Sequence, residues 1–249
     1  MAFSRDFCAS ILTTDKSRQA VGIGAGTLPT LVKAFLQFRK SGSGVFASNA
    51  AEAGGFAKLT PESTRPEIQY HFLPTALRDH GRKPTMGFGM TLHCCQLRPK
   101  SRGYIGLKSA DPFADPLIQP NYLSHDDDIA ELLEGVKLGR RIMQSAAMLP
   151  YNNGTEMEPG LQTRSDEQIV SFIRDKAETI YHPVGSCKMG SDPMAVVDDR
   201  LRVRGIANLR VADASIMPRV IGGNTNAPCM VIGEKASRMV LADRNTAPQ

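Results

Sequence analysis

Alternation of apolar and polar residues with a period of two is the feature that most restricts how this chain can fold. It runs through residues 66–72 and 90–97 and returns at 103–108, with Pro, Gly and Asp between these stretches. Such alternation is typical of half-buried strands, and the Pro, Gly and Asp turns between them favour antiparallel pairing. The sequence therefore predicts an antiparallel sheet in the middle of the chain.

Two helices are predicted beside this sheet from their first residues. Ser124 stands ahead of three consecutive aspartates, 126–128, which suit the positive end of a helix, and Arg140 and Arg141 suit its negative end. Ser165 and Gln168 have the spacing of a capping box. Both helices are interpreted as packing elements that flank the sheet.

The two ends of the chain differ from its middle. Residues 31–40 have the pattern of an amphipathic helix, and the glycines that follow, from Gly42, are interpreted as its end rather than as a dinucleotide-binding loop, which should follow a strand. Residues 201–203 and 209–214 predict strands, and residues 230–240 predict a final helix. Strand, loop and helix in this order are typical of an α/β layer.

Composition excludes several classes of protein. Sixteen prolines spread over 249 residues disfavour a helical bundle, and the longest apolar runs, such as 227–232, have only six residues, too few for the roughly 20 of a membrane-spanning helix. The net charge is +5, of which +4 falls on residues 1–40 (six Lys and Arg against two Asp). A basic excess confined to one arm disfavours a nucleic-acid binder, which needs a basic face on its folded core.

The cysteines and the first residues indicate a cytoplasmic protein. The five cysteines are odd in number and form no CxxC or zinc-finger spacing, so neither a cysteine metal site nor a disulfide framework is expected. Residues 1–8 lack the continuous apolar stretch of a secretory signal. We expect reduced thiols, no bound metal and no transmembrane segment.

Two short segments could carry chemistry. His182 precedes a proline and lies in an extended stretch, where imidazole suits proton transfer near neutral pH, although a structural histidine explains it as well. Residues 224–228 combine Asn, Thr and Pro ahead of the final helix. Those residue types suit a plain helix cap, and they also suit an anion site, such as one that stabilises a reduced flavin.

The C-terminal part of the chain resembles the glucose–methanol–choline (GMC) family of FAD-dependent alcohol dehydrogenases and oxidases, in the style of its choline-dehydrogenase-like branch. Three long blocks carry the resemblance in the family's order, and two weaker blocks support it: residues 181–190, 210–218 and 222–228, then 97–103 and 115–123. The resemblance extends over residues 45–242 and implies hydride transfer from a primary alcohol to flavin N5, giving an aldehyde.

The resemblance implies roles for seven residues. His182 matches the catalytic base and Asn226 the second catalytic position, which hydrogen-bonds the substrate oxygen. Four residues match cofactor-binding positions: Asp213, Ala214, Asn224 and Thr225. Glu52 falls where the family places a residue near the substrate entrance, and a surface-loop glutamate is an equal alternative.

The expected fold class is α+β. Residues 1–40 are predicted to be a loosely ordered N-terminal segment, 41–189 an antiparallel-sheet substrate-binding domain with flanking helices, and 190–249 the C-terminal strand–helix return of an α/β FAD-binding domain. No GxGxxG loop for the ADP half of FAD occurs among the 249 residues.

This departure from the family pattern leaves two interpretations of function open. The first is an alcohol oxidoreductase whose chain is truncated, a fragment, or complemented by an N-terminal half. The second is a non-catalytic remnant or partner chain that binds no FAD alone. The sequence names neither the alcohol nor the electron acceptor, which could be oxygen or a quinone.

Overall fold

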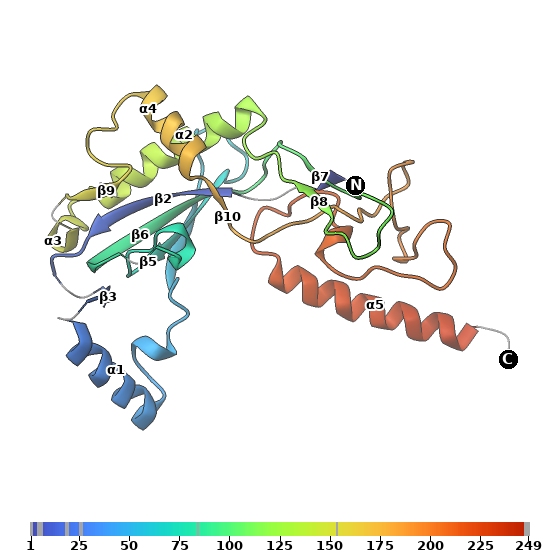
Figure 1. Cartoon of the computed structure of the whole chain (residues 1–249), viewed down its shortest axis with the longest axis horizontal. Helices are drawn as coiled ribbons and strands as arrows, with labels where there is room; N and C mark the ends of the chain where they lie inside the picture. Colours follow the sequence, from blue (N-terminus) through green and yellow to red (C-terminus); the bar gives the residue numbers. More distant parts are fainter. Residues whose placement is uncertain are drawn as a thin grey trace. The chain divides into compact units, whose positions relative to one another are not determined.

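A computed structural model describes residues 2–3, 7–17, 20–24, 27–83, 85–152 and 154–246 (Figure 1). The chain forms two compact units. The sheet unit contains residues 8–96 and 129–178, and the C-terminal unit contains residues 1–7, 97–128 and 179–249. The two units interleave in sequence, whereas the sequence predicted contiguous domains over 41–189 and 190–249.

The sheet unit is built on a seven-stranded sheet with the strand order β10-β2-β6-β5-β4, to which β3 adds at β6 and β9 at β2. Neighbours β2, β6, β5 and β4 all pair antiparallel, which confirms the predicted sheet. The stretches predicted as strands at 66–72 and 90–97 are β5 and β6. The strands are β2 (Phe7–Thr14), β3 (Gly22–Ile23), β4 (Ala53–Ala57), β5 (Ile68–Leu73), β6 (Gly87–Gln96), β9 (Glu156–Glu158) and β10 (Glu178–Thr179).

Strand β2 corrects the prediction for the N-terminal segment. It lies between β10 and β6, and its Ile11 and Leu12 side chains are completely buried, so residues 7–14 are not loosely ordered. The sequence missed this strand because both of its faces are covered. A strand of that kind shows an apolar run rather than alternation.

Helix α1 (Leu28–Ser41) matches the helix predicted over 31–40. It ends at Gly42, which has a left-handed φ of 63° and donates its backbone N–H to the Phe38 carbonyl, as expected for a C-terminal glycine. Ala34 is its one buried residue, and five large apolar side chains of the helix are exposed: Leu28, Val32, Phe35, Leu36 and Phe38. This part of the N-terminal segment therefore contributes little to the core. A short 3-10 turn, η2 (Val45–Ala47), follows it.

Helix α2 (Asp126–Met143) approaches one face of the sheet closely because two of its residues are glycines. A Cβ on Gly135 would lie 2.6 Å from the Cys94 Sγ, and one on Gly139 would lie 2.7 Å from the Ile11 Cδ1. The Tyr70 hydroxyl donates to the Gly135 carbonyl at 2.6 Å. Burial raises the pKa of the Tyr70 hydroxyl and of the Cys94 thiol well above their usual ranges, so both groups stay uncharged in this contact.

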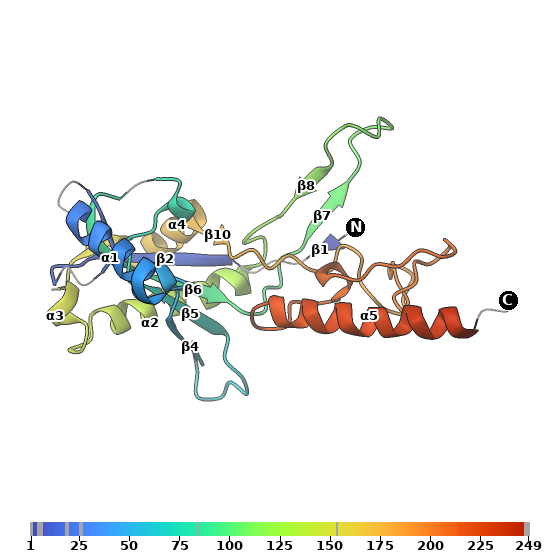
Figure 2. The ribbon, with the colours of Figure 1, turned by 90° about the horizontal axis from the view of Figure 1, so that it is seen from below.

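Helix α4 (Asp166–Lys176) lies on the opposite side of β2 from α2 (Figure 2). Its predicted capping box is confirmed. The Ser165 hydroxyl accepts the Gln168 backbone N–H at 3.3 Å, and the Gln168 side chain accepts the Ser165 N–H at 3.1 Å. The unit is completed by two short elements, α3 (Leu149–Asn152) and η3 (Asp79–Gly81).

The C-terminal unit contains a small antiparallel sheet of β1 (Ala2–Phe3), β7 (Gly103–Gly106) and β8 (Leu117–Gln119). The third predicted strand, 103–108, thus belongs to this sheet and not to the large one. The strands predicted at 201–203 and 209–214 are not formed: the two stretches meet only at an isolated bridge between Arg202 and Arg210, where the Val203 and Val211 N–H groups donate to the Leu209 and Leu201 carbonyls, and Ala214 already belongs to a 3-10 turn.

Helix α5 (Asn226–Thr246) packs its Ala236 and Ile232 on a core of Val197, Leu201 and Ile216, the last from the 3-10 turn η4 (Ala214–Ile216). The α+β fold class is therefore confirmed. No helix within the described ranges is both long and apolar enough to cross a membrane.

Candidate active site

His182 is carried by a segment that is fixed to the core of the C-terminal unit. Val184, two residues further on, is 1% exposed and packs with Met217 and Val220. The Met189 backbone N–H donates to the Ile216 carbonyl of η4 at 2.7 Å. These contacts hold the backbone that follows His182, while its own ring is half-buried.

The residues on both sides of His182 have left-handed backbone conformations. Tyr181 has a φ of 67° and Gly185 a φ of 91°. Tyr181 is held in this conformation in part by the Thr179 hydroxyl, which accepts its backbone N–H at 3.0 Å. Such a conformation is uncommon for a tyrosine, and strained backbone of this kind clusters at functional sites.

The start of α5 lies beside this histidine. The Asn224 Nδ2 is 3.5 Å from the His182 Nε2. Thr225 is 9% exposed, and its carbonyl accepts the Cys229 N–H at 2.9 Å, which begins the helix at Asn226. The structure thus brings together His182 and Asn224, two of the residues singled out from sequence, 42 positions apart.

Gly222 permits the turn that leads to Asn224. It has a φ of 76°, and a Cβ at this position would lie 2.4 Å from Nη1 of Arg98. The Arg98 guanidinium therefore packs directly on the loop. Arg98 belongs to one of the sequence blocks that resemble the family, but the sequence assigned it no role. Its contact, the loop at Gly222, lies more than 120 positions away along the chain.

Asp213 and Ala214 lie at the start of η4. The Asp213 carboxylate accepts the Ser215 backbone N–H at 2.7 Å and caps this turn, of which Ala214 is the first residue. The same turn carries the carbonyls that anchor the His182 segment. The predicted cofactor residues are therefore part of the framework that holds the predicted base.

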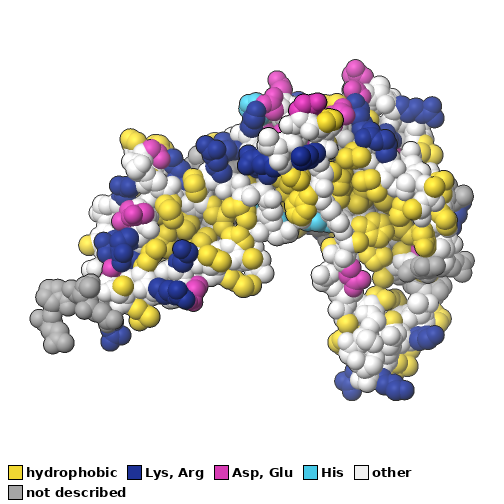
Figure 3. Space-filling view, turned by 180° about the vertical axis from the view of Figure 1, so that it is seen from behind, with side chains coloured by type: hydrophobic (Ala, Val, Ile, Leu, Met, Phe, Trp, Pro, Cys, Tyr) yellow, Lys and Arg dark blue, Asp and Glu magenta, His cyan; other side chains and the backbone are white. Residues whose placement is uncertain are grey.

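An apolar recess of about 740 Å³ lies between the residues after η4 and the first turns of α5. Apolar side chains also gather on the face of the C-terminal unit seen in Figure 3. The recess is lined by Met189, Ile216, Met217, Pro218, Arg219, Val220, Ile221, Ala227, Pro228, Val231 and Ile232. The recess offers a ligand an apolar contact surface next to the N-terminus of α5.

The family model of the GMC oxidoreductases matches residues 99–233, more than half of the chain, including His182 and the start of α5. The chain belongs to the GMC oxidoreductase family. The match confirms the resemblance found in the sequence blocks.

Curated GMC relatives are considerably longer than this chain. An alcohol dehydrogenase [acceptor] from Pseudomonas putida is 49% identical over 232 residues, which cover 93% of this chain and 42% of the relative. An oxygen-dependent choline dehydrogenase from Escherichia coli is 46% identical over 199 residues, covering 80% of this chain and 36% of the relative. The chain thus spans less than half the length of these relatives.

Solved structures share the fold. A formate oxidase from Aspergillus oryzae superposes with a TM-score of 0.86 at 24% identity, over 98% of this chain and 47% of that one. A pyridoxine 4-oxidase from Mesorbium loti gives a TM-score of 0.76 at 24% identity, over 95% and 42% of the two chains.

Glu52 lies in the sheet unit, just before β4, and lines a cavity of about 490 Å³. Among the described residues that line it, Glu52 alone is charged, and the others are Val21, Gly44, Val45, Ser48, Ala50, Pro74 and Thr75. The Glu52 carboxylate therefore lies in a cavity wall that is partly apolar.

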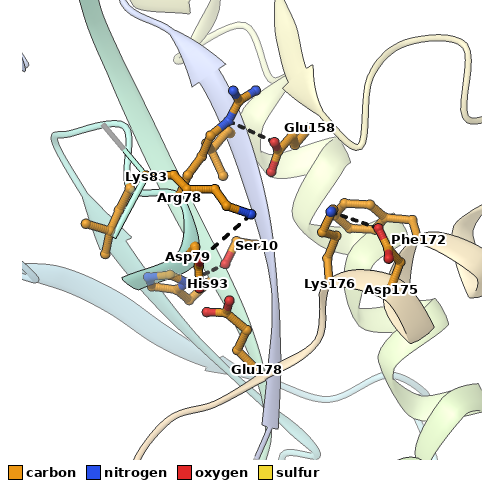
Figure 4. A pocket seen from close by; sticks show the side chains of 12 residues that line it. Ser10, Arg78, Asp79, Lys83, His93, Glu158, Phe172, Asp175, Lys176 and Glu178 are labelled. Carbon is orange, nitrogen blue, oxygen red and sulfur yellow. Dashed lines mark hydrogen bonds and ion pairs between the residues drawn. The ribbon is translucent and has the colours of Figure 1, made fainter. Parts of the chain in front are cut away.

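A second cavity of the sheet unit, of about 260 Å³, has a polar floor and a charged rim (Figure 4). On its floor the Ser10 hydroxyl lies 2.7 Å from the His93 Nδ1, across the β2–β6 pair. The rim cations each have an acidic partner: Arg78 with Glu158 at 2.8 Å, Lys83 with Asp79 at 3.7 Å, and Lys176 with Asp175 at 2.8 Å. These three pairs neutralise the rim cations, and Glu178 adds a fourth carboxylate to the lining.

Metal ligation finds no support in the described part of the chain, where no three His, Cys, Asp or Glu side chains gather closely enough to hold an ion.

Proposed function

We propose that the protein that carries this chain oxidises a primary alcohol to an aldehyde, with FAD as cofactor and His182 as the base. One observation carries the proposal: the backbone that follows His182 is hydrogen-bonded to η4, and the His182 Nε2 lies 3.5 Å from the Asn224 amide just before α5. The imidazole can accept a proton, and the nearby helix N-terminus favours negative charge.

The residues of the C-terminal unit suit the flavin end of FAD. Asn224 and Thr225 lead into α5, whose free N–H groups favour an anionic ring edge, and Asp213 and Ala214 begin η4 beside the apolar recess. When bound, FAD would accept the hydride that leaves the carbinol carbon. The described residues that would hold it belong to a single unit.

The chain's own groups would handle the proton and the oxygen. His182 would take the proton of the substrate hydroxyl, and Asn226 would hydrogen-bond the same oxygen from the first position of α5. The C–O bond becomes a carbonyl as the proton and the hydride leave adjacent atoms. The His182 and Asn226 side chains must therefore contact the same C–O group of the substrate. We expect them to lie within a few ångströms of each other.

The rest of the enzyme is proposed to come from residues outside this sequence. The relatives are more than twice as long as the part that this chain matches, and the 249 residues contain no GxGxxG loop. We propose a complementing N-terminal half that supplies the ADP site, with the sheet unit as the substrate-binding part. The alternative is a remnant that retains the site residues without binding flavin.

The isolated chain is expected to bind FAD weakly, because the pyrophosphate finds no glycine-rich loop and helix N-terminus of its own. Titration of the 249-residue chain with FAD, followed by flavin fluorescence, should give a dissociation constant above 1 μM. Addition of an N-terminal half of a relative as a second chain should tighten it.

Two outcomes of this titration are decisive. Submicromolar affinity of the isolated chain would contradict the need for a second half. A complemented complex without a visible flavin band would support the non-catalytic remnant.

Glu52 is proposed to select the alcohol. The curated relatives are named for alcohol and for choline, and a carboxylate as the one charge in its cavity favours an alcohol with a cationic head group. For the complemented enzyme, Glu52→Gln should raise the KM for choline about twofold to fivefold, the worth of one exposed ion pair, and leave the KM for a neutral primary alcohol unchanged.

Glu62, an exposed glutamate of the same unit, provides the matched control, since Glu62→Gln should change neither value. Equal changes of KM for choline and the neutral alcohol in Glu52→Gln would contradict a charge-selecting role.

A further inference from the structure

We infer that helix α1 and the turn η2 form a surface that binds an anionic phospholipid bilayer by lying in its interface. We call this surface, residues 28–47, the α1–η2 face. The inference is independent of the proposed alcohol oxidation, because it uses none of the proposed site residues and can be tested without flavin.

The α1–η2 face gathers large apolar side chains in contact with solvent. Four of them lie on one side of α1, at the spacing i, i+4, i+7 and i+8, and each is at least half exposed: Leu28, Val32, Phe35 and Leu36. Val45 and Phe46 of η2 add two more, and the Phe46 ring meets the Phe35 ring edge-on, with centroids 6.1 Å apart. Apolar side chains gathered in this way mark an interaction site, in contrast to apolar residues scattered singly.

The charge of this part of the chain is entirely positive. Residues 16–51 contain five Lys and Arg and no Asp or Glu. Lys33 and Lys40 lie three and four positions from Leu36, so they flank the apolar side of the helix, and Arg39 lies in the last turn. All three cations are exposed, and no described residue forms an ion pair with them. An apolar helix side bordered by Lys and Arg is typical of a helix that lies in the plane of a bilayer interface.

The α1–η2 face projects from the sheet unit. In Figure 1 both elements lie below the sheet, away from α2 and α4, and the lower-right lobe of Figure 3 shows hydrophobic and basic side chains next to one another. Helix α1 packs on η2, and Ala34 is its one buried residue. The apolar side of the helix is therefore left for a partner outside the described residues of the unit.

Charge decides which partner the α1–η2 face suits. A second copy docked through the same face would place its own Lys33, Arg39 and Lys40 against those of the first, and like charges in contact repel. A bilayer with anionic lipids attracts each Lys and Arg near its surface and also accepts the apolar side chains between the headgroups. The lipid surface therefore complements both properties of the face.

Binding of the 249-residue chain to lipid vesicles tests the inference. The chain should sediment with vesicles of an equal mixture of phosphatidylcholine and phosphatidylglycerol and bind pure phosphatidylcholine vesicles more than about tenfold more weakly. Lys33→Gln combined with Lys40→Gln should weaken binding to the anionic vesicles about 25-fold, or about fivefold for each cation. Leu36→Gln should weaken it about tenfold, the worth of one buried leucine.

Leu107 and Lys108 provide matched controls, because both are exposed and belong to the C-terminal unit. Leu107→Gln and Lys108→Gln should leave vesicle binding at its parent value. The replaced side chains of α1 are exposed as well, so the fold should be kept, and circular dichroism of each variant checks this.

A tryptophan placed on the helix distinguishes insertion of the apolar side from loose adsorption, because the chain contains no other tryptophan. On the anionic vesicles, the emission of Leu36→Trp should shift to shorter wavelength and be quenched by brominated lipid. The emission of Leu107→Trp should do neither.

Four results would overturn the inference: no binding to the anionic vesicles, equal binding to both kinds of vesicle, equal losses in the control variants, or an unchanged Leu36→Trp emission on binding. A Leu36→Trp shift without lipid would overturn it as well. If that shift grows with chain concentration, the face joins two copies; if it requires an added N-terminal half of a relative, the face docks that half.

Discussion

His182→Ala is expected to lower the rate of flavin reduction by an alcohol about 10²–10⁴-fold in the complemented enzyme, the usual contribution of a general base. The substitution removes the imidazole that lies beside Asn224, which is the proposed acceptor of the hydroxyl proton. Anaerobic stopped-flow absorbance at the flavin band measures this step directly, separately from reoxidation by the electron acceptor.

His125→Ala serves as the control, because His125 lies in the same unit but at the exposed start of α2. Its flavin reduction rate should stay within twofold of the parent. An unchanged rate in His182→Ala, with normal flavin content, would show that another group takes the proton and that the catalytic assignment is wrong.

Arg140→Ala is expected to lower the free energy of unfolding by about 3–5 kcal/mol. The Arg140 side chain is 14% exposed and makes a bidentate pair with the Glu156 carboxylate, which is 3% exposed, at 2.6 and 3.0 Å. It also donates to the Thr163 and Gly160 carbonyls at 2.5 and 2.8 Å. Its removal leaves a buried carboxylate and two carbonyls without this donor.

Urea denaturation followed by circular dichroism gives the free energy. Arg141→Ala is the matched control, because Arg141 is the next residue of α2 and is exposed; its removal should cost less than about 0.5 kcal/mol. Equal losses in the two variants would mean that the Arg140–Glu156 pair does not hold α2 to β9.

The proposed catalytic residues could be singled out from sequence because they are concentrated in short segments. His182 and residues 224–226 combine imidazole, amides and a helix start within a few positions each. What the sequence could not show is that Asn224, rather than only its backbone, reaches His182. A contact over 42 positions depends on how the η4 and α5 segments fold back on each other.

Strand β2 shows the opposite case. Its eight residues contain two fully buried aliphatic side chains at neighbouring positions, Ile11 and Leu12, and therefore no alternation. Local pattern detects a strand when one face meets water. The tertiary structure covers both faces of β2, and this removes the signal.

The sequence by itself determined the local elements of this protein: the alternation of β5 and β6, the capping box of α4, the glycine that ends α1, and the blocks that mark a GMC oxidoreductase. Each depends on neighbours within about ten residues. Only the tertiary structure decided that residues 97–128 leave the sheet unit, and that of two adjacent arginines Arg140 is buried against Glu156 while Arg141 meets solvent. Burial and ion pairing depend on which distant segments meet, and identical side chains on neighbouring positions of a helix point to different surroundings.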